Sequence, residues 1–138
     1  MELQLSLYPR QRLSVPVYGQ IAAGRPLPEM MSAGKRVIRV PDRSVNHRFC
    51  AVIVVGDSLR DAGIQSGDVA VCRMQKHLDY DGQLTAVLTP SGLTLKYVFK
   101  DFEDKVRLEG ANSNYLPQWY DAQDVSFQGV VVRIERDF

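Results

Sequence analysis

Turn residues divide this sequence at close intervals into short β-branched and apolar segments, which leaves little room for helices. The segments expected to form strands are Arg36–Val40, Phe49–Val55, Val69–Arg73, Leu84–Leu88, Leu93–Phe99, Val106–Leu108 and Val125–Ile134. Strong turn signals separate them, for example at Asp79–Gly82 and Pro90–Gly92. Only Ser58–Gly63 predicts a helical turn or two, with Gly63 ending it. We therefore expect a mainly β, compact domain of sandwich or partial-barrel type.

The first thirty residues differ in kind from the rest. Proline and glycine punctuate them too often for a long helix, at Pro9, Pro16, Gly19, Gly24, Pro26 and Pro28. Within this arm, Val15–Ile21 predicts a short edge strand and Ala22–Pro26 a loop. We expect an arm at 1–30 and one folded domain at 31–138.

The charge balance gives no global attraction to nucleic acid or to a membrane. The chain has 138 residues, with 17 Lys and Arg against 16 Asp and Glu and a formal net charge of +1. Its longest apolar run, Phe49–Val55, has seven residues, against roughly 20 for a membrane-spanning helix. There is no secretory pattern at the N-terminus. These features predict a cytoplasmic protein without a membrane segment.

A basic stretch formed by Lys35, Arg36, Arg39 and Arg43 invites a nucleic-acid interpretation. Asp42 interrupts it, however, and no aromatic residue is interleaved. We interpret it as a solvated strand edge and expect no direct DNA binding by this chain.

Several kinds of site are not expected from the sequence. His47 and His77 lie outside any zinc-binding spacing, and Cys50 and Cys72 are 22 positions apart, which favours two buried thiols. No glycine loop for phosphate or dinucleotide is present. Gly56–Arg60 begins like a nucleophile elbow, but Arg60 stands where that motif needs glycine. We expect neither metal nor cofactor.

Ser58 and Lys96 are the residues that could carry chemistry. Ser58 follows an apolar run directly, and its simplest role is to cap the helical stretch after it. Strand alternation places Leu93, Leu95, Tyr97 and Phe99 on one face and Thr94, Lys96 and Val98 on the other. If that second face is covered, desolvation lowers the pKa of Lys96, and its neutral amine can accept a proton from a serine hydroxyl. The alternative is a solvated lysine on an exposed face.

Three motifs in order resemble the self-cleaving LexA/UmuD family. Val54–Val71 is similar to its serine signature, Leu93–Val98 to its lysine strand, and Val15–Pro26 to its self-cleavage segment. The resemblance covers roughly residues 15–138. It implies a Ser58/Lys96 dyad, separated by 38 positions, that cleaves the Ala23–Gly24 bond of its own chain. Two departures, Leu59 for methionine and Ser113 for proline, leave the dyad untouched.

The resemblance also implies how the reaction is supported and controlled. The small residues Ala22, Ala23 and Gly24 allow close approach to Ser58, and the backbone N–H groups of Ser58 and Asp57 would stabilise the oxyanion. The implied activator is a filament of RecA on single-stranded DNA. A homodimer is implied too, and we expect the long C-terminal strand, as a free edge, to pair across it.

Two family branches are open for the biological role, and we prefer the UmuD-like branch because the arm starts at a distance typical of that group. If Met1 is the native start, too few residues precede Ala23 for a helix-turn-helix, and the chain looks like UmuD, a subunit of a translesion DNA polymerase. If Met1 was added to a fragment, the chain would be the C-terminal domain of a LexA-like or phage repressor. Two further alternatives are a dimeric interaction module without activity and a protease that acts on other proteins.

Overall fold

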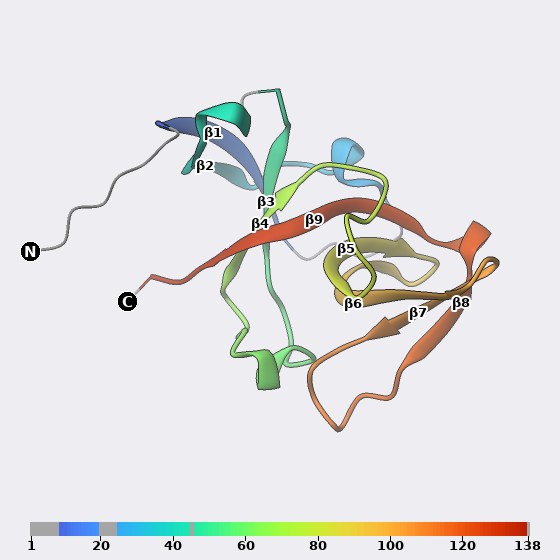
Figure 1. Cartoon of the computed structure of the whole chain (residues 1–138). Helices are drawn as coiled ribbons and strands as arrows, with labels where there is room; N and C mark the ends of the chain where they lie inside the picture. Colours follow the sequence, from blue (N-terminus) through green and yellow to red (C-terminus); the bar gives the residue numbers. More distant parts are fainter. Residues whose placement is uncertain (1–8, 20–24, 45, 138) are drawn as a thin grey trace, which may run out of the picture.

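The described residues form one nine-stranded sheet with short helical turns between the strands, and Figure 1 shows their arrangement. The computed structural model describes residues 9–19, 25–44 and 46–137. The strands are β1 (Arg10–Tyr18), β2 (Gly34–Pro41), β3 (Phe49–Ile53), β4 (Val69–Arg73), β5 (Gln83–Thr89), β6 (Gly92–Phe102), β7 (Lys105–Glu109), β8 (Gln118–Asp121) and β9 (Ser126–Glu135). The single-turn 3-10 helices are η1 (Leu27–Glu29), η2 (Asp42–Ser44), η3 (Arg60–Ala62) and η4 (Ala122–Asp124).

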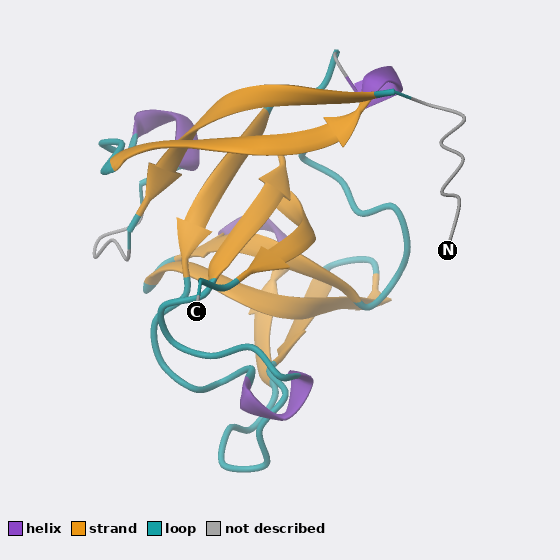
Figure 2. Cartoon of the chain, turned by 90° about the vertical axis from the view of Figure 1, so that its left-hand side faces the viewer, coloured by secondary structure: helices purple, strands orange, loops and turns teal. Residues whose placement is uncertain are grey.

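The sheet has the strand order β2-β1-β3-β4-β9-β5-β6-β7-β8. Neighbouring strands are antiparallel, except that β1 runs parallel to β3. β9 joins the two halves, because its first part pairs with β5 and its second part with β4 (Figures 1 and 2). The sheet is curled rather than flat (Figures 1 and 2), and apolar clusters lie within each half and between the halves.

Among the described residues, three clusters of buried side chains fill the interior. One lies between β1, β2, β3 and β4, and contains Val15, Ile38, Val40, Phe49, Ala51 and Val71. Another lies under β5, β6 and β7, and contains Val87, Val98, Val106 and Leu108. The largest joins the halves and includes Cys50, Val52, Val54, Leu59, Ala86 and Leu95. Burial alternates along β7, where the side chains of Val106 and Leu108 point inward. This alternation is the period-two pattern from which the sequence predicts a strand.

The sequence predictions of the fold class and of most strands are confirmed. Every segment expected as a strand from residue 36 onward overlaps one, and η3 followed by Gly63 forms at the expected helical turn. The strand that was not expected is β8, a four-residue segment of which only Tyr120 is partly buried. Its pattern carries no apolar alternation, so only its pairing with β7 makes it a strand.

Two predictions about sheet edges are wrong. β1 lies between β2 and β3, and Pro16 is tolerated because β3 pairs only with Val17 and Tyr18. β9 is not a free edge either, since it pairs with β4 and with β5. The outermost strands are β2 and β8. Sequence patterns alone do not give the order of strands in a sheet, which depends on long-range contacts.

Cys50 and Cys72 are free, buried thiols that lie opposite each other on β3 and β4. Within the described ranges, no helical segment has the length and hydrophobicity needed to cross a lipid bilayer.

Candidate active site

Ser58 lies on the loop that leaves β3 and returns as β4. The two sides of this loop are joined at its base, where the Val54 N–H donates to Asp68 O and the Gly67 N–H to Val54 O, both over 2.8 Å. Gly56 turns the chain with a φ of +88°, which favours glycine strongly. The sequence therefore places Ser58 just after a rigid buried strand.

An ion pair between a buried carboxylate and an exposed arginine also holds this loop. Asp68, 2% exposed, accepts hydrogen bonds from Arg136, which follows β9, and from the Gln65 N–H. Arg136 further donates to Gly63 O over 2.8 Å, at the end of η3. The bond from Arg136 holds the pKa of Asp68 at about 2, so Asp68 stabilises the fold at neutral pH and loses that effect as the pH falls toward 2.

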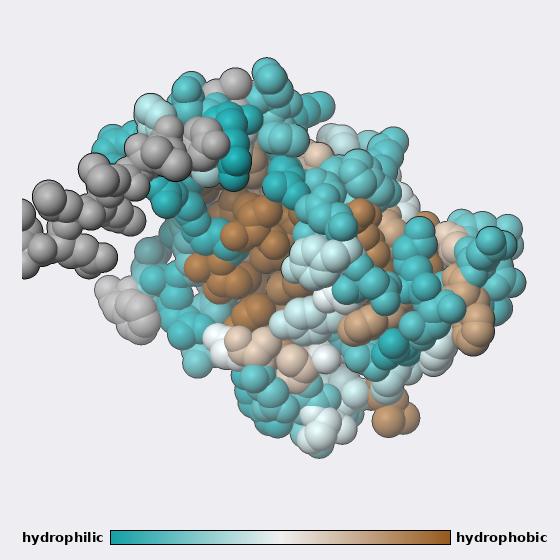
Figure 3. Space-filling view, in the orientation of Figure 1, coloured by the Kyte–Doolittle hydropathy of each residue, from teal (hydrophilic) through white to brown (hydrophobic). Residues whose placement is uncertain are grey.

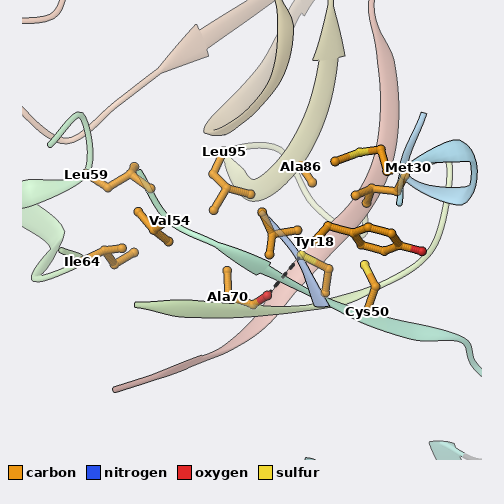
Figure 4. Packing of buried hydrophobic residues seen from close by; sticks show 12 residues of the cluster. Tyr18, Met30, Cys50, Val54, Leu59, Ile64, Ala70, Ala86 and Leu95 are labelled. Atoms are coloured by element: carbon orange, nitrogen blue, oxygen red, sulfur yellow. Dashed lines mark hydrogen bonds between the residues drawn. The ribbon is translucent and has the colours of Figure 1, made fainter. Parts of the chain in front are cut away.

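Ser58 does not cap the short helix that follows it, so that prediction is wrong. Leu59 occupies the N-cap position of η3, and no side chain makes a capping hydrogen bond there. Leu59 is 2% exposed and points into the core toward Val54 and Leu95 (Figure 4). The buried Leu59 side chain holds the turn against the core, and the Ser58 side chain faces the cleft described next.

Ser58 and Lys96 meet in a cleft of about 140 Å³. The walls come from the end of β3, the serine loop and the start of β6, and also include Gly19 after β1. The lining residues are Gly19, Val52, Ile53, Val54, Val55, Ser58, Leu59, Leu93, Thr94, Leu95 and Lys96. Most of these side chains are aliphatic, so the Lys96 amine lies among apolar groups.

The Lys96 amine is within hydrogen-bond distance of two hydroxyl groups. Its Nζ lies 3.2 Å from Ser58 Oγ and 2.8 Å from Thr94 Oγ1. Burial lowers the pKa of Lys96 below the ordinary value of 10.5. A neutral amine has one lone pair and two N–H bonds. With one N–H donated to Thr94, the lone pair is available to accept the proton of Ser58.

Sequence reasoning missed Thr94 as a residue of this site. Thr94 lies two positions before Lys96 on β6, and side chains of a strand alternate between its two faces, so both lie on the same face. This alternation was the sequence signal that could have placed Thr94 in the site. The alternative of a solvated Lys96 does not hold, because Lys96 is only partly exposed and its amine contacts both hydroxyls.

The loop from Gly110 to Tyr115 packs directly on the serine turn. The Ala111 N–H donates to Ser58 O over 2.6 Å, and the Asp61 N–H donates to Ala111 O over 2.7 Å. Gly110 approaches so closely that a Cβ there would lie 2.5 Å from Ser58 O. The two loops also lie side by side in Figures 1 and 2. The resemblance pointed to this segment only through Ser113, which stands where the family often has proline in a turn near Asn112 and Tyr115.

Asp57, the other residue predicted to supply an oxyanion N–H, lies at the exposed side of the turn. Its carboxylate accepts a hydrogen bond from the Tyr115 hydroxyl over 2.6 Å, which raises the pKa of Tyr115. In the described part of the chain, the Ser58 N–H donates no hydrogen bond. It is therefore available to a substrate oxygen.

The predicted cleavage residues, Ala23 and Gly24, lie outside the described residues. Across residues 9–19, 25–44 and 46–137, no three His, Cys, Asp or Glu side chains are grouped as a metal site.

A family model and the similar curated proteins agree on one family for this chain. A family model described as "Peptidase S24-like" matches residues 16–132. A LexA repressor of Gluconobacter oxydans is 31% identical over 129 residues, which are 94% of this chain and 54% of that protein. A LexA repressor of Cereibacter sphaeroides is 34% identical over 128 residues, covering 91% of this chain and 56% of the relative. The chain thus spans about half the length of these relatives.

Proposed function

The chain belongs to the peptidase S24-like family, and from this premise we propose that it is a self-cleaving serine peptidase domain in which Ser58 is the nucleophile and Lys96 the general base. The observation that carries the proposal is the 3.2 Å contact between Lys96 Nζ and Ser58 Oγ in an apolar cleft. Its substrate is the Ala23–Gly24 bond of the same polypeptide.

The reaction runs in two halves. Ser58 Oγ attacks the Ala23 carbonyl carbon while Lys96 Nζ takes the hydroxyl proton, and the N–H groups of Ser58 and Asp57 stabilise the oxyanion. The Lys96 ammonium then protonates the Gly24 nitrogen, and the peptide C–N bond breaks. Water attacks the Ala23–Ser58 ester with Lys96 again as base, which releases the Ala23 carboxylate and regenerates the serine.

The course of the chain supports Ala23–Gly24 as the substrate. Gly19, which directly follows β1, lines the same cleft as Ser58 and Lys96. Ala23 is four residues further on, and four residues span at most about 14 Å. The small side chains of Ala23 and Gly24 also suit an approach to a narrow cleft.

An intramolecular substrate has a high effective concentration, so the reaction needs a restraint. A lysine that is mostly protonated at neutral pH is one restraint, and an arm mostly docked elsewhere is another. We propose that a RecA filament on single-stranded DNA relieves this restraint by favouring the cleavage-competent arrangement.

We expect purified protein to cut itself between Ala23 and Gly24, faster as the pH rises from about 7 to about 10, because more Lys96 is then unprotonated. Intact mass spectrometry at each pH measures both the position and the rate. Scission elsewhere would reject the proposed bond. A chain that stays intact at every pH, with or without the filament, would favour the inactive interaction module.

The relatives reported above are named LexA repressor, so we favour the repressor branch of the family for the full-length protein. In that role self-cleavage would separate this domain from a DNA-binding part and end repression. A UmuD-like polymerase subunit is the other candidate role, and the genomic reading frame upstream of Met1 distinguishes the two.

We also propose that the domain forms a homodimer through the face of β9. Figure 3 shows apolar side chains gathered where β9 crosses β4, bordered by hydrophilic ones, and Val132 on β9 is 45% exposed. Sedimentation is expected to give a dimer at micromolar concentration, and Val132→Glu should shift it to a monomer. A wild-type monomer would contradict the proposal.

A further inference from the structure

Asn112 lies in the loop that packs on the serine turn, and its side chain is almost fully buried, with 6% of the residue exposed. Its Nδ2 donates to Asp57 O over 2.9 Å. Its Oδ1 accepts from the Asn114 N–H over 3.0 Å and from the Arg60 guanidinium over 3.2 Å. Because both donors point at Oδ1, the side-chain amide has one orientation, with its NH₂ group toward Asp57.

The carbonyl that Asn112 binds belongs to the peptide group that joins Asp57 to Ser58. Asp57 C=O and Ser58 N–H are the two ends of one planar peptide unit, and the described chain contains no cis peptide bond. In a trans unit the two groups point in opposite directions. A donor that fixes the Asp57 carbonyl therefore also fixes the direction of the Ser58 N–H, and it polarises that N–H as a donor.

The contacts around this peptide unit are unequal at its two ends. Asp57 O accepts from Asn112 Nδ2 and also from the Arg60 N–H, over 3.1 Å. The Ser58 N–H, by contrast, has no acceptor among the described residues. One end of the unit is thus held by two donors while the other end is left for a ligand.

Given the proposed function, on which this inference rests, we infer that Asn112 is a positioning residue, which orients and polarises the Ser58 N–H toward the oxyanion of the tetrahedral intermediate. Asn112 itself does not touch the reacting atoms. It acts through the Asp57–Ser58 peptide unit, and Arg60 and Asn114 hold its amide in the required orientation.

The test measures self-cleavage of Asn112→Ala and Asn112→Asp across the pH range. Loss of a direct oxyanion donor typically lowers a rate by about 100- to 1,000-fold. Since one hydrogen bond to Asp57 O remains, we expect a smaller fall of about 10- to 100-fold in the plateau rate. The pH midpoint should stay at the wild-type value, because the amine of Lys96 is not altered. Labelling of Ser58 by a fluorophosphonate should slow in parallel.

Ser113→Ala is the matched control. Ser113 directly follows Asn112 in the same loop, but its side chain is exposed and takes part in none of the hydrogen bonds among the described residues, so we expect wild-type rates. If Asn112→Ala shifts the pH midpoint, or lowers the melting temperature enough to unfold the chain at the assay temperature, its role is structural and the inference is wrong. Equal rates in Asn112→Ala and wild type would overturn the inference alone. A wild-type chain that neither cleaves nor is labelled would overturn the proposed function and the inference together.

Discussion

Ser58→Ala and Lys96→Ala are each expected to abolish self-cleavage, with a fall of about 1,000-fold or more in the rate. The first removes the nucleophile, and the second removes the base that lies 3.2 Å from it. Lys96→Arg should be equally inactive, because a guanidinium stays protonated throughout the accessible pH range. The double variant should be no slower than either single variant, since the two residues act as one unit. Intact mass spectrometry over long incubations measures each rate.

Lys100→Ala is the control for these variants. Lys100 lies on the same strand, β6, but is exposed and far along it from the cleft, so the variant should cleave at the wild-type rate. Persistent scission at Ala23–Gly24 in Lys96→Arg would show that another group accepts the serine proton. Persistent scission in Ser58→Ala would remove the covalent mechanism altogether.

Gly110→Ala is expected to have the second largest effect on activity. The added Cβ would lie 2.5 Å from Ser58 O, and this oxygen belongs to the backbone, which cannot rotate away as a flexible side chain does. The serine turn must therefore move, so we expect at least about a 100-fold slower cleavage, comparable to loss of an oxyanion donor. Overpacking should lower the free energy of unfolding by about 1 to 3 kcal/mol. Urea unfolding and cleavage assays measure the two effects.

Gly129→Ala distinguishes an effect on the stability of the fold from an effect on the position of the serine turn. A Cβ at Gly129 would lie 2.9 Å from Arg73 O, a similarly close backbone contact, but at the junction of β4 and β9 rather than beside Ser58. We expect comparable destabilisation with a nearly unchanged cleavage rate. If both variants lose activity in proportion to their stability, the close packing of Gly110 has no specific role in the site.

The strands could be predicted because their patterns are local. Period-two alternation, β-branched residues and turn residues together located the strands from β2 to β7 and the long β9. β8 was missed because its pairing with β7, not its own sequence, makes it a strand. The places of β1 and β9 inside the sheet order were also missed, since both depend on partners far away in the sequence.

The residues of the candidate site also fall into those that local patterns predicted and those that depend on long-range packing. Ser58 and Lys96 were predicted from a motif and from the alternation of β6, and the structure brings their side chains together. Gly110 and Asn112 were not predicted as part of it, because they are more than fifty positions from Ser58 and only tertiary packing places them on the serine turn. The sequence signal at Asn112 was its place in a turn that the family shares, and a turn motif does not indicate what the side chain binds.

The central claim is that the Lys96 amine loses its proton more readily than an ordinary lysine. NMR titration of the Lys96 side chain tests it most directly, in the Ser58→Ala chain so that the protein stays intact. The mechanism predicts a midpoint for Lys96 below the ordinary lysine value of 10.5. A midpoint at or above 10.5 would contradict it, because the amine would then be protonated when it has to accept the serine proton.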